Sequence, residues 1–409
     1  MIETNRRAVR SLAGVLGLAT VITACQGSIV DLGTVENEEL DRPEALAPLV
    51  AGMGRTLSAA VGLLAQTGMI ASREMVYGGL GDDFGFTFAQ VAGELNPVDS
   101  DRHWNTSQQA RWTAEDGVRR MRQVLGDEEF ARSRLAAEAL LHVGFANRLL
   151  GENMCEGLVD GGPPGPRTIH FQRAEDAFTE ALEIANRIGE SQLAEAARAG
   201  RASSRVGLGD WGGARSDAET VPAGFAFRAR YSTMELAQYN RVFWGSTAAN
   251  RAHTVWSTFY EGYYEETGDP RVPWKTDLAN PEMRNGLPWY AQAKYEGRDA
   301  PIDLVSWEEM RLIVAEARLR EGDVEGAIAA IDALRVAAGV DPWPIDGLEG
   351  AWTALKRERG IELWLEGRRL WDLHRWLQEG TPGEAEDMTG RDTCVPIGAI
   401  ERGTNPNIP

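Results

Sequence analysis

The sequence is poor in the two side chains that most often bind metals or act in catalysis. Its 409 residues include 5 histidines and 3 cysteines. The histidines stand far apart, and no HExxH motif occurs. The nucleophile motif GxSxG and the phosphate-binding motif GxxxxGK are missing as well. We therefore expect a protein that is not an enzyme and that has no cofactor and no metal site.

Basic residues are also in the minority. The chain has 42 Lys and Arg against 61 Asp and Glu, which gives a net charge of -19 and an isoelectric point near 4.8. Nucleic-acid binding requires a basic patch, and adhesion to an anionic lipid surface requires clustered Lys and Arg. The composition therefore argues against both kinds of partner.

Long apolar runs are scarce, and the clearest one lies at the N-terminus. Arg6, Arg7 and Arg10 precede an apolar run from Leu12 to Val21, which ends in the sequence Ile-Thr-Ala-Cys at Cys25. This pattern predicts a lipoprotein signal peptide over residues 1–24, with Cys25 acylated after cleavage. An ordinary signal peptide with an incidental cysteine is the alternative. We expect a membrane attachment through lipid without a spanning helix, because no other stretch is apolar enough to span. Residues 25–42 are polar and acidic and read as a lipid-proximal tether.

Two cysteines remain after such processing, Cys155 and Cys394. In an oxidising compartment the pair could form a disulfide that ties the tail to the middle of the chain. Two independent buried thiols are an equally good interpretation of the sequence.

The stretch from Ala351 to Trp376 has no proline and reads as one long helix. Its apolar residues point in nearly every direction around the helix axis, which is typical of a helix buried on several sides. Buried charges need partners, and the spacing allows Glu366 to pair with Arg369 and Arg368 to pair with Asp372. Gly367 in the middle of such a helix indicates close approach of another backbone.

This stretch carries a family resemblance. Arg359-Gly360-Ile361-Glu362-Leu363, Glu366-Gly367-Arg368-Arg369 and Trp371 to Trp376 resemble the RxxELxxEGxRxxDLxRW segment of the SusD/RagB family. The chain also ends like that family, with Val395-Pro396-Ile397-Gly398 and later Asn405-Pro406-Asn407. A buried, ion-paired helix of some other all-α protein is the alternative interpretation.

Helix–turn–helix units recur along the chain. Leu193–Leu208 and Ala214–Val221 flank Gly209-Asp210, and a second copy near Trp307 has Gly322-Asp323 at its turn. Small residues at the crossings are typical of tetratricopeptide repeats, although unrelated helical hairpins would look similar. We expect an all-α fold: a tetratricopeptide-like helical-repeat scaffold with a loop-rich, aromatic-rich insertion. The predicted body spans residues 43–409, with repeats at about 129–222 and 307–378 and the insertion at about 223–302.

The insertion is the predicted ligand side, because a long loop-rich segment on a rigid scaffold is where binding sites tend to lie. Aromatic rings can stack on sugars or on peptide side chains. Most aromatic residues of the insertion are expected in the core. Those that flank turn signals are the candidate exposed ligand-binding residues: Tyr263, Tyr264, Trp274, Trp289 and Tyr290.

The resemblance implies a nutrient-binding lipoprotein of the outer membrane, lipid-anchored and exposed at the cell surface. Such a protein captures an oligosaccharide or peptide and delivers it to a partner, a SusC-like TonB-dependent transporter. A lipid-anchored tetratricopeptide scaffold that organises envelope proteins is the main alternative, and a hydrolase is a third.

Overall fold

The computed structural model describes residues 37–79 and 85–409 of the chain. The predicted signal peptide at 1–24 and the acylated Cys25 lie outside the described residues. Part of the predicted tether lies inside them. Residues Asn37–Asp41 form a 3-10 helix, and the guanidinium of Arg120 donates to the backbone carbonyl of Asn37 and to the carboxylate of Asp41. The folded body therefore includes residues 37–42, which the sequence assigned to the tether.

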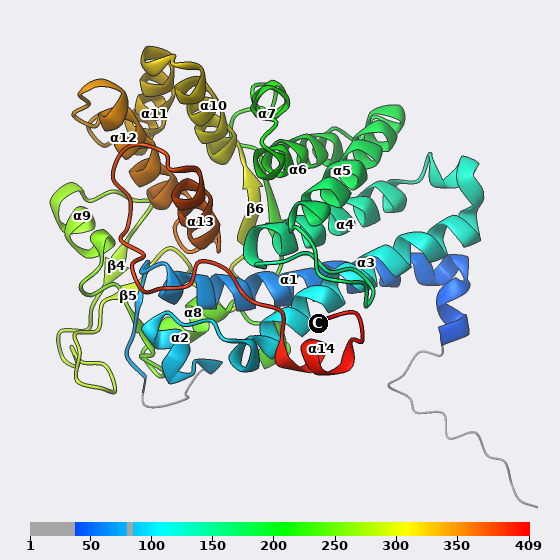
Figure 1. Cartoon of the computed structure of the whole chain (residues 1–409), viewed down its shortest axis with the longest axis horizontal. Coiled ribbons are helices and arrows are strands. Elements are labelled where there is room, and N and C mark those ends of the chain that lie inside the picture. Colours follow the sequence, from blue (N-terminus) through cyan, green and yellow to red (C-terminus); the bar gives the residue numbers. More distant parts are fainter. Residues whose placement is uncertain (1–36, 80–84) are drawn as a thin grey trace, which may run out of the picture.

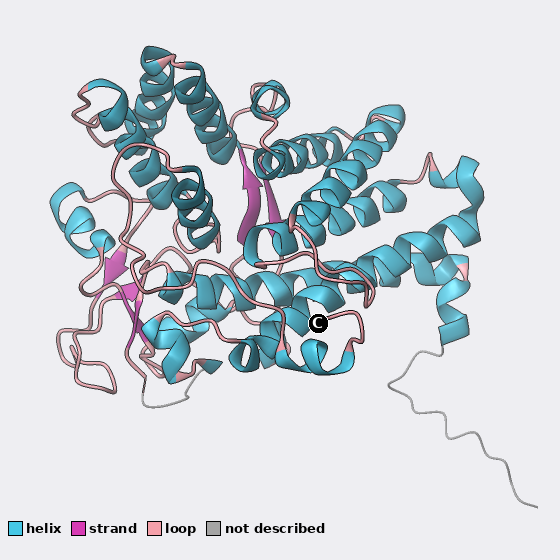
Figure 2. Cartoon of the chain, viewed as in Figure 1, coloured by secondary structure: helices cyan, strands magenta, loops and turns pink. Residues whose placement is uncertain are grey.

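Helices dominate the described chain, and the strands form three short antiparallel pairs (Figures 1 and 2). The pairs are β1 (Val76–Tyr77) with β3 (His253–Thr254), β2 (Ala226–Ala229) with β6 (Ile302–Ser306), and β4 (Trp274–Lys275) with β5 (Ala291–Gln292). The helices are α1 (Leu46–Ala71), α2 (Phe88–Ala92), α3 (Pro97–Phe130), α4 (Arg134–Asn153), α5 (Thr168–Ile188), α6 (Ser191–Leu208), α7 (Trp211–Ala218), α8 (Arg241–Ser246), α9 (Phe259–Thr267), α10 (Trp307–Glu321), α11 (Val324–Ala338), α12 (Gly347–Glu362), α13 (Arg369–Glu379) and α14 (Ala399–Thr404).

The predicted repeat scaffold is present. Helices α4 to α7 and α10 to α12 pack each against the next, and α7 joins the two groups by packing on α10. Both Gly-Asp turns have the same design: Gly209 and Gly322 end one helix with a positive φ, while Asp210 and Asp323 cap the next. A glycine tolerates that backbone conformation, and an aspartate oxygen satisfies a free N–H at the start of a helix. Two residues thus fix the sharp reversal in each unit.

Glycines let the repeat helices approach closely. Phe178 of α5 lies against Gly144 of α4 and Gly200 of α6, where a Cβ would come within 2.5 and 2.4 Å of the ring. Phe171, two turns earlier on α5, is buried against Gly151 and Gly207 in the same manner. The small residues noted in the sequence therefore form notches that receive two fully buried rings.

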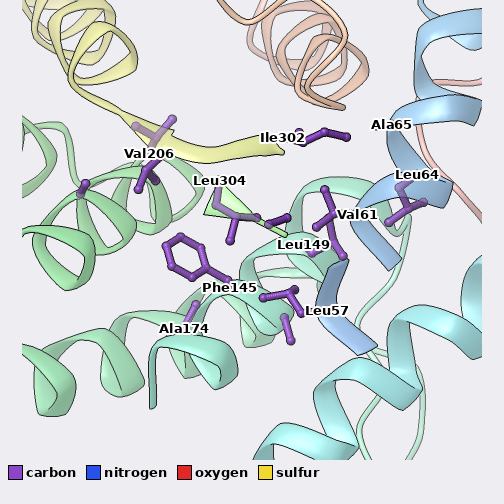
Figure 3. Close-up of a cluster of buried hydrophobic side chains, with 14 of the residues drawn as sticks. Leu57, Val61, Leu64, Ala65, Phe145, Leu149, Ala174, Val206, Ile302 and Leu304 are labelled. Atoms are coloured by element: carbon purple, nitrogen blue, oxygen red, sulfur yellow. The ribbon is translucent and has the colours of Figure 1, made fainter. Parts of the chain in front are cut away.

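The core is centred where α1 crosses the repeat scaffold. Figure 3 shows Leu57, Val61 and Leu64 of α1 facing Phe145 and Leu149 of α4, with Leu304 of β6 closing the cluster. In Figure 1, α1 runs below both groups of paired helices.

One helix among the described residues, Pro43–Ala71, is long and apolar enough to cross a membrane. The sequence had not led us to expect such a helix. Half of the most apolar stretch of this helix is buried inside the protein, and α1 packs on α3, α4 and α8, as a core helix does.

The prediction of one long helix from 351 to 376 is wrong. Helix α12 ends at Glu362, a turn covers residues 363–367, and α13 begins at Arg369. Leu365 and Gly367 take positive φ values of 63° and 75° in this turn. The backbone N–H of Leu365 donates to the carboxylate of Glu74 at 2.8 Å. A residue distant in sequence therefore stabilises the turn between the two helices. The predicted close approach of another backbone at Gly367 is confirmed, and that backbone belongs to α1.

The charges of this segment are paired, but not with the predicted partners. Glu366 contacts Lys294 at 2.7 Å, and Arg368 contacts Glu152 at 3.0 Å and Glu309 at 2.7 Å. Asp372 contacts Arg359 at 2.8 Å and Arg375 at 2.9 Å. The break between α12 and α13 changes which side chains face one another, so the three- and four-residue spacing of a continuous helix does not apply.

Other helix boundaries follow the sequence with local corrections. The first repeat helix, expected from about residue 129, begins at Arg134, because Gly126 breaks the end of α3 with a φ of 71° and Ser133 caps α4. Cys155 and Cys394 are joined by a disulfide. The backbone N–H of Cys155 also donates to the carbonyl of Val395 at 2.9 Å. The C-terminal tail is thereby fixed beside the end of α4.

Candidate ligand-binding site

The loop-rich insertion is tied to the repeat scaffold by a buried ionic network. Arg271 contacts Asp269 at 2.8 Å, Glu358 at 2.6 Å and Glu362 at 2.8 Å, so one guanidinium links the insertion to α12. Arg335 of α11 contacts the same Glu358 at 3.0 Å. The carboxylates surrounding Arg271 raise its pKa against the opposing effect of burial. The network gives the loops a rigid base.

Three of the five candidate aromatic residues form one half-buried group, which we call the ring cluster: Tyr264, Trp274 and Tyr290. The rings of Trp274 and Tyr290 stack with centroids 4.5 Å apart, and Tyr264 lies 6.0 Å from Trp274 at a tilt of 60°. The indole N–H of Trp274 donates to the carbonyl of Glu261 at 3.3 Å. The rings come from α9, β4 and the residue before β5, so three separate segments build one aromatic group. These elements lie at the left side of Figure 1.

The expectation of exposure is wrong for the other two candidates. Tyr263 is 6% exposed, and its hydroxyl donates to Asp269 at 2.8 Å while it accepts from Arg335 at 3.1 Å. Trp289 is 4% exposed and packs with Met283 and Ala291 in a small second core. Turn signals in the sequence place a residue near a bend, but they do not say which face of the bend it occupies. Both residues belong to the framework of the insertion.

A polar hollow of about 350 Å³ lies at the base of the β4–β5 ribbon. Pro273 and Ala293 line it from the ribbon, and the charged side chains of Lys294, Asp303 and Glu366 line it from below. Burial raises the pKa of Glu366 to about 8, although Lys294 lies close and acts in the opposite direction. The carboxyl oxygens of Asp303 and Glu366 and the ammonium of Lys294 offer acceptors and donors for the polar groups of a ligand. The sequence analysis missed Lys294 and Glu366 here, because their partners are distant in the chain.

A larger hollow of about 930 Å³ lies elsewhere, between the start of α1 and the middle of α3. Its walls include Pro48, Leu49 and Thr113, and no aromatic ring lines it. The larger hollow therefore lacks the aromatic face that the ring cluster has. Within the described ranges, no group of three or more His, Cys, Asp and Glu side chains could hold a metal ion.

The comparisons with known proteins agree on one fold. Residues 308–399 match the model of the SusD family. A SusD-like protein from Bacteroides fragilis superposes with a TM-score of 0.66 at 14% identity, covering 92% of this chain and 98% of that one. The chain is thus similar to the SusD family in sequence over residues 308–399 and in fold over most of its length. The matched residues run from α10 through the break between α12 and α13 to the start of α14.

Two further solved structures with this fold bear names that state a ligand. One is a SusD-like carbohydrate binding protein from Bacteroides vulgatus, with 16% identity, a TM-score of 0.58 and coverage of 81% of this chain and 83% of that one. The other is a laminarin binding SusD-like protein, with 15% identity, a TM-score of 0.58 and coverage of 89% and 98%. At such identities the likeness shows the fold. No curated protein matches the sequence.

Proposed function

We propose that this SusD/RagB protein captures an oligosaccharide at the cell surface and passes it to a partner TonB-dependent transporter. The observation that carries the proposal is the ring cluster, where Trp274 and Tyr290 stack at 4.5 Å on a rigidly anchored loop region. Half-buried aromatic rings offer a flat apolar face to the C–H face of a sugar at low entropic cost. The carbohydrate-binding names of two relatives support this ligand class over a peptide.

The proposed action is binding without chemistry. All five histidines are buried, and burial lowers the pKa of each one, to about 4 for His103 and about 3 for His253. A buried neutral imidazole is not positioned to exchange protons with a ligand at the surface. The proposal also includes outer-membrane attachment through an acyl group on Cys25, which accounts for the signal-like pattern at residues 1–24.

Two measurements test the proposal. Calorimetric titration with laminarihexaose, maltohexaose, xylohexaose and mannohexaose is expected to give saturable binding for at least one of them. Pull-down of the native protein from detergent-solubilised membranes is expected to recover a large β-barrel protein. No binding in the titrations, together with recovery of envelope proteins but no barrel, would favour the scaffold alternative.

A further inference from the structure

A second aromatic feature lies away from the ring cluster, on α3. Trp112 is 56% exposed, and it is the only tryptophan among the large, strongly exposed hydrophobic side chains of the described residues. It lines a hollow of about 280 Å³, close to the lower limit of roughly 300 Å³ for small-ligand pockets. The other lining residues come from α3, the loop after α4 and α14: Gln108, Gln109, Arg111, Leu158, Asp160, Gly161 and Glu401. An exposed indole beside polar groups in a hollow is typical of a ligand site.

The polar groups beside Trp112 are fixed in place by a buried cation. Arg111 is 3% exposed, and its guanidinium donates to Gln108 at 2.9 Å and to Asp160 at 2.8 Å. Gln108 in turn donates its amide to the carbonyl of Leu158 at 3.1 Å. The Asp160 side chain itself stays 64% exposed. Arg111 therefore fixes the position of the Asp160 carboxylate, and this carboxylate remains accessible to a ligand in the hollow.

The loop that forms the outer wall is held at several points. The Cys155–Cys394 disulfide fixes its start, and Gly157 and Gly165 exchange backbone hydrogen bonds at 2.8 and 2.9 Å. The amides of Asn405 and Asn407 donate to the carbonyls of Gly162 and Gly161, at 3.1 and 2.8 Å. The terminal Asn405-Pro406-Asn407 thus holds the Gly- and Pro-rich run from Gly161 to Pro166 in place. A wall that is rigid before binding loses little entropy when a ligand arrives.

We propose that this hollow is a second saccharide subsite, which takes one pyranose ring of a neutral oligosaccharide. The sugar stacks on the indole of Trp112, and Asp160 accepts hydrogen bonds from its hydroxyls while Gln109 offers an amide. Gln109 also lines the groove of about 930 Å³, so a longer chain passes over Gln109 into that groove. The inference rests on the proposed glycan ligand, and it adds a site far from α9, β4 and β5 in Figure 1.

The test follows the two aromatic sites separately. The full-length mature protein is labelled with 5-fluorotryptophan, and the fluorine signals of Trp112 and Trp274 are assigned by their loss in Trp112→Phe and Trp274→Phe. The same four hexasaccharides are then titrated. We expect at least one of them to move the Trp112 signal to saturation. Because either substitution removes the Trp112 signal, the affinity of these variants is measured by calorimetric titration. Trp112→Ala is expected to weaken binding of that hexasaccharide about tenfold, because a stacking face is lost, and Trp112→Phe is expected to restore part of it.

Phe88→Ala is the matched control, since Phe88 is 72% exposed and lines none of the hollows described above. It is expected to leave the titration unchanged, and thermal unfolding checks that every variant is folded. A Trp112 signal that no hexasaccharide moves overturns the inference. If the Trp274 signal still moves in that experiment, the proposed glycan binding stands alone. If neither signal moves, both proposals fall.

Discussion

Gly367 lies so close to α1 that a Cβ at this position would come within 3.1 Å of the Cα of Ala65. The contact joins the break in the family motif to the central core helix. Gly367→Ala is expected to lower the free energy of unfolding by about 2–4 kcal/mol, because a positive φ of 75° and a backbone contact act together. Urea unfolding measures the difference. Gly189→Ala is the matched control, with a φ of 76° and nothing within 4 Å, and should lose only about 1 kcal/mol.

Arg368 is expected to be the costliest charge to remove. Its guanidinium lies 3.0 Å from Glu152 and 2.7 Å from Glu309, and all three side chains are buried. Arg368→Met leaves two carboxylates with one cation fewer, so we expect a loss of about 3 kcal/mol or more in unfolding free energy. The exposed pair of Arg132 with Glu128 supplies the control: Arg132→Met should change stability by less than about 1 kcal/mol. Equal losses in the two variants would contradict the role given to Arg368.

The disulfide is expected to contribute measurably to stability. It closes a ring across a sequence separation of 239 residues, and removing a native disulfide commonly costs about 2–5 kcal/mol. Thermal unfolding of the mature protein should shift to lower temperature on reduction. The double variant Cys155→Ser with Cys394→Ser should unfold at that lower temperature whether or not reductant is present. A wild-type transition that reductant leaves in place would show that the bridge does not form in the protein.

Stability is expected to fall as pH rises above neutral. Burial raises the pKa of Glu366 to about 8 and that of Glu74 to about 7, from an ordinary value of 4.5. The native state therefore holds protons that the unfolded chain has released, and this contribution is lost as pH rises from 4.5 through 8. The buried histidines act in the opposite direction below pH 6.5, because only the unfolded chain protonates them there.

Above pH 6.5 these carboxyl groups are expected to dominate over the histidines. Glu366→Gln should flatten the decline in unfolding free energy between pH 6.5 and 8.5, since each group contributes at most about 1.4 kcal/mol per pH unit. Glu128→Gln changes an exposed side chain and should leave the profile as in the wild type. Urea unfolding at three pH values in this window is sufficient. An unchanged slope in Glu366→Gln would mean that Glu366 is ionised throughout.

Binding and framework roles in the insertion should separate by mutation. Trp274→Ala removes the middle ring of the ring cluster and is expected to lower hexasaccharide affinity about tenfold. It should also lower thermal stability, because the half-buried indole packs against the core. Tyr263→Phe removes a buried hydroxyl that contacts Asp269 and Arg335, so it should lower stability by about 1–3 kcal/mol and leave affinity unchanged. The reverse pattern would assign the two residues the opposite roles.

Much of the architecture was readable from local chemistry. The Gly-Asp turns at 209–210 and 322–323 predicted helix reversals, because glycine permits the positive φ and aspartate caps the following helix. The family motif from Arg359 to Trp376 was recognisable without coordinates. The residues that contact this motif could not be recognised from the sequence. The break after Glu362 depends on Glu74, which is almost 300 residues earlier in the chain, so helical spacing assigned the wrong ion pairs.

The candidate site, too, was predictable in part from the sequence and depended in part on tertiary packing. Sequence composition selected the aromatic-rich insertion, since turn signals and rings are local properties. Whether a ring faces solvent depends on what packs over it, and this separates Trp274 from Trp289, which pairs with its own small core. The hollow at Trp112 needed three segments, α3, the loop after α4 and the C-terminal tail, to meet around one indole. The sequence determined the helical hairpins and their Gly-Asp turns. Only tertiary packing decided which rings and charges remain at the surface, because burial is set by neighbours that are remote in the chain.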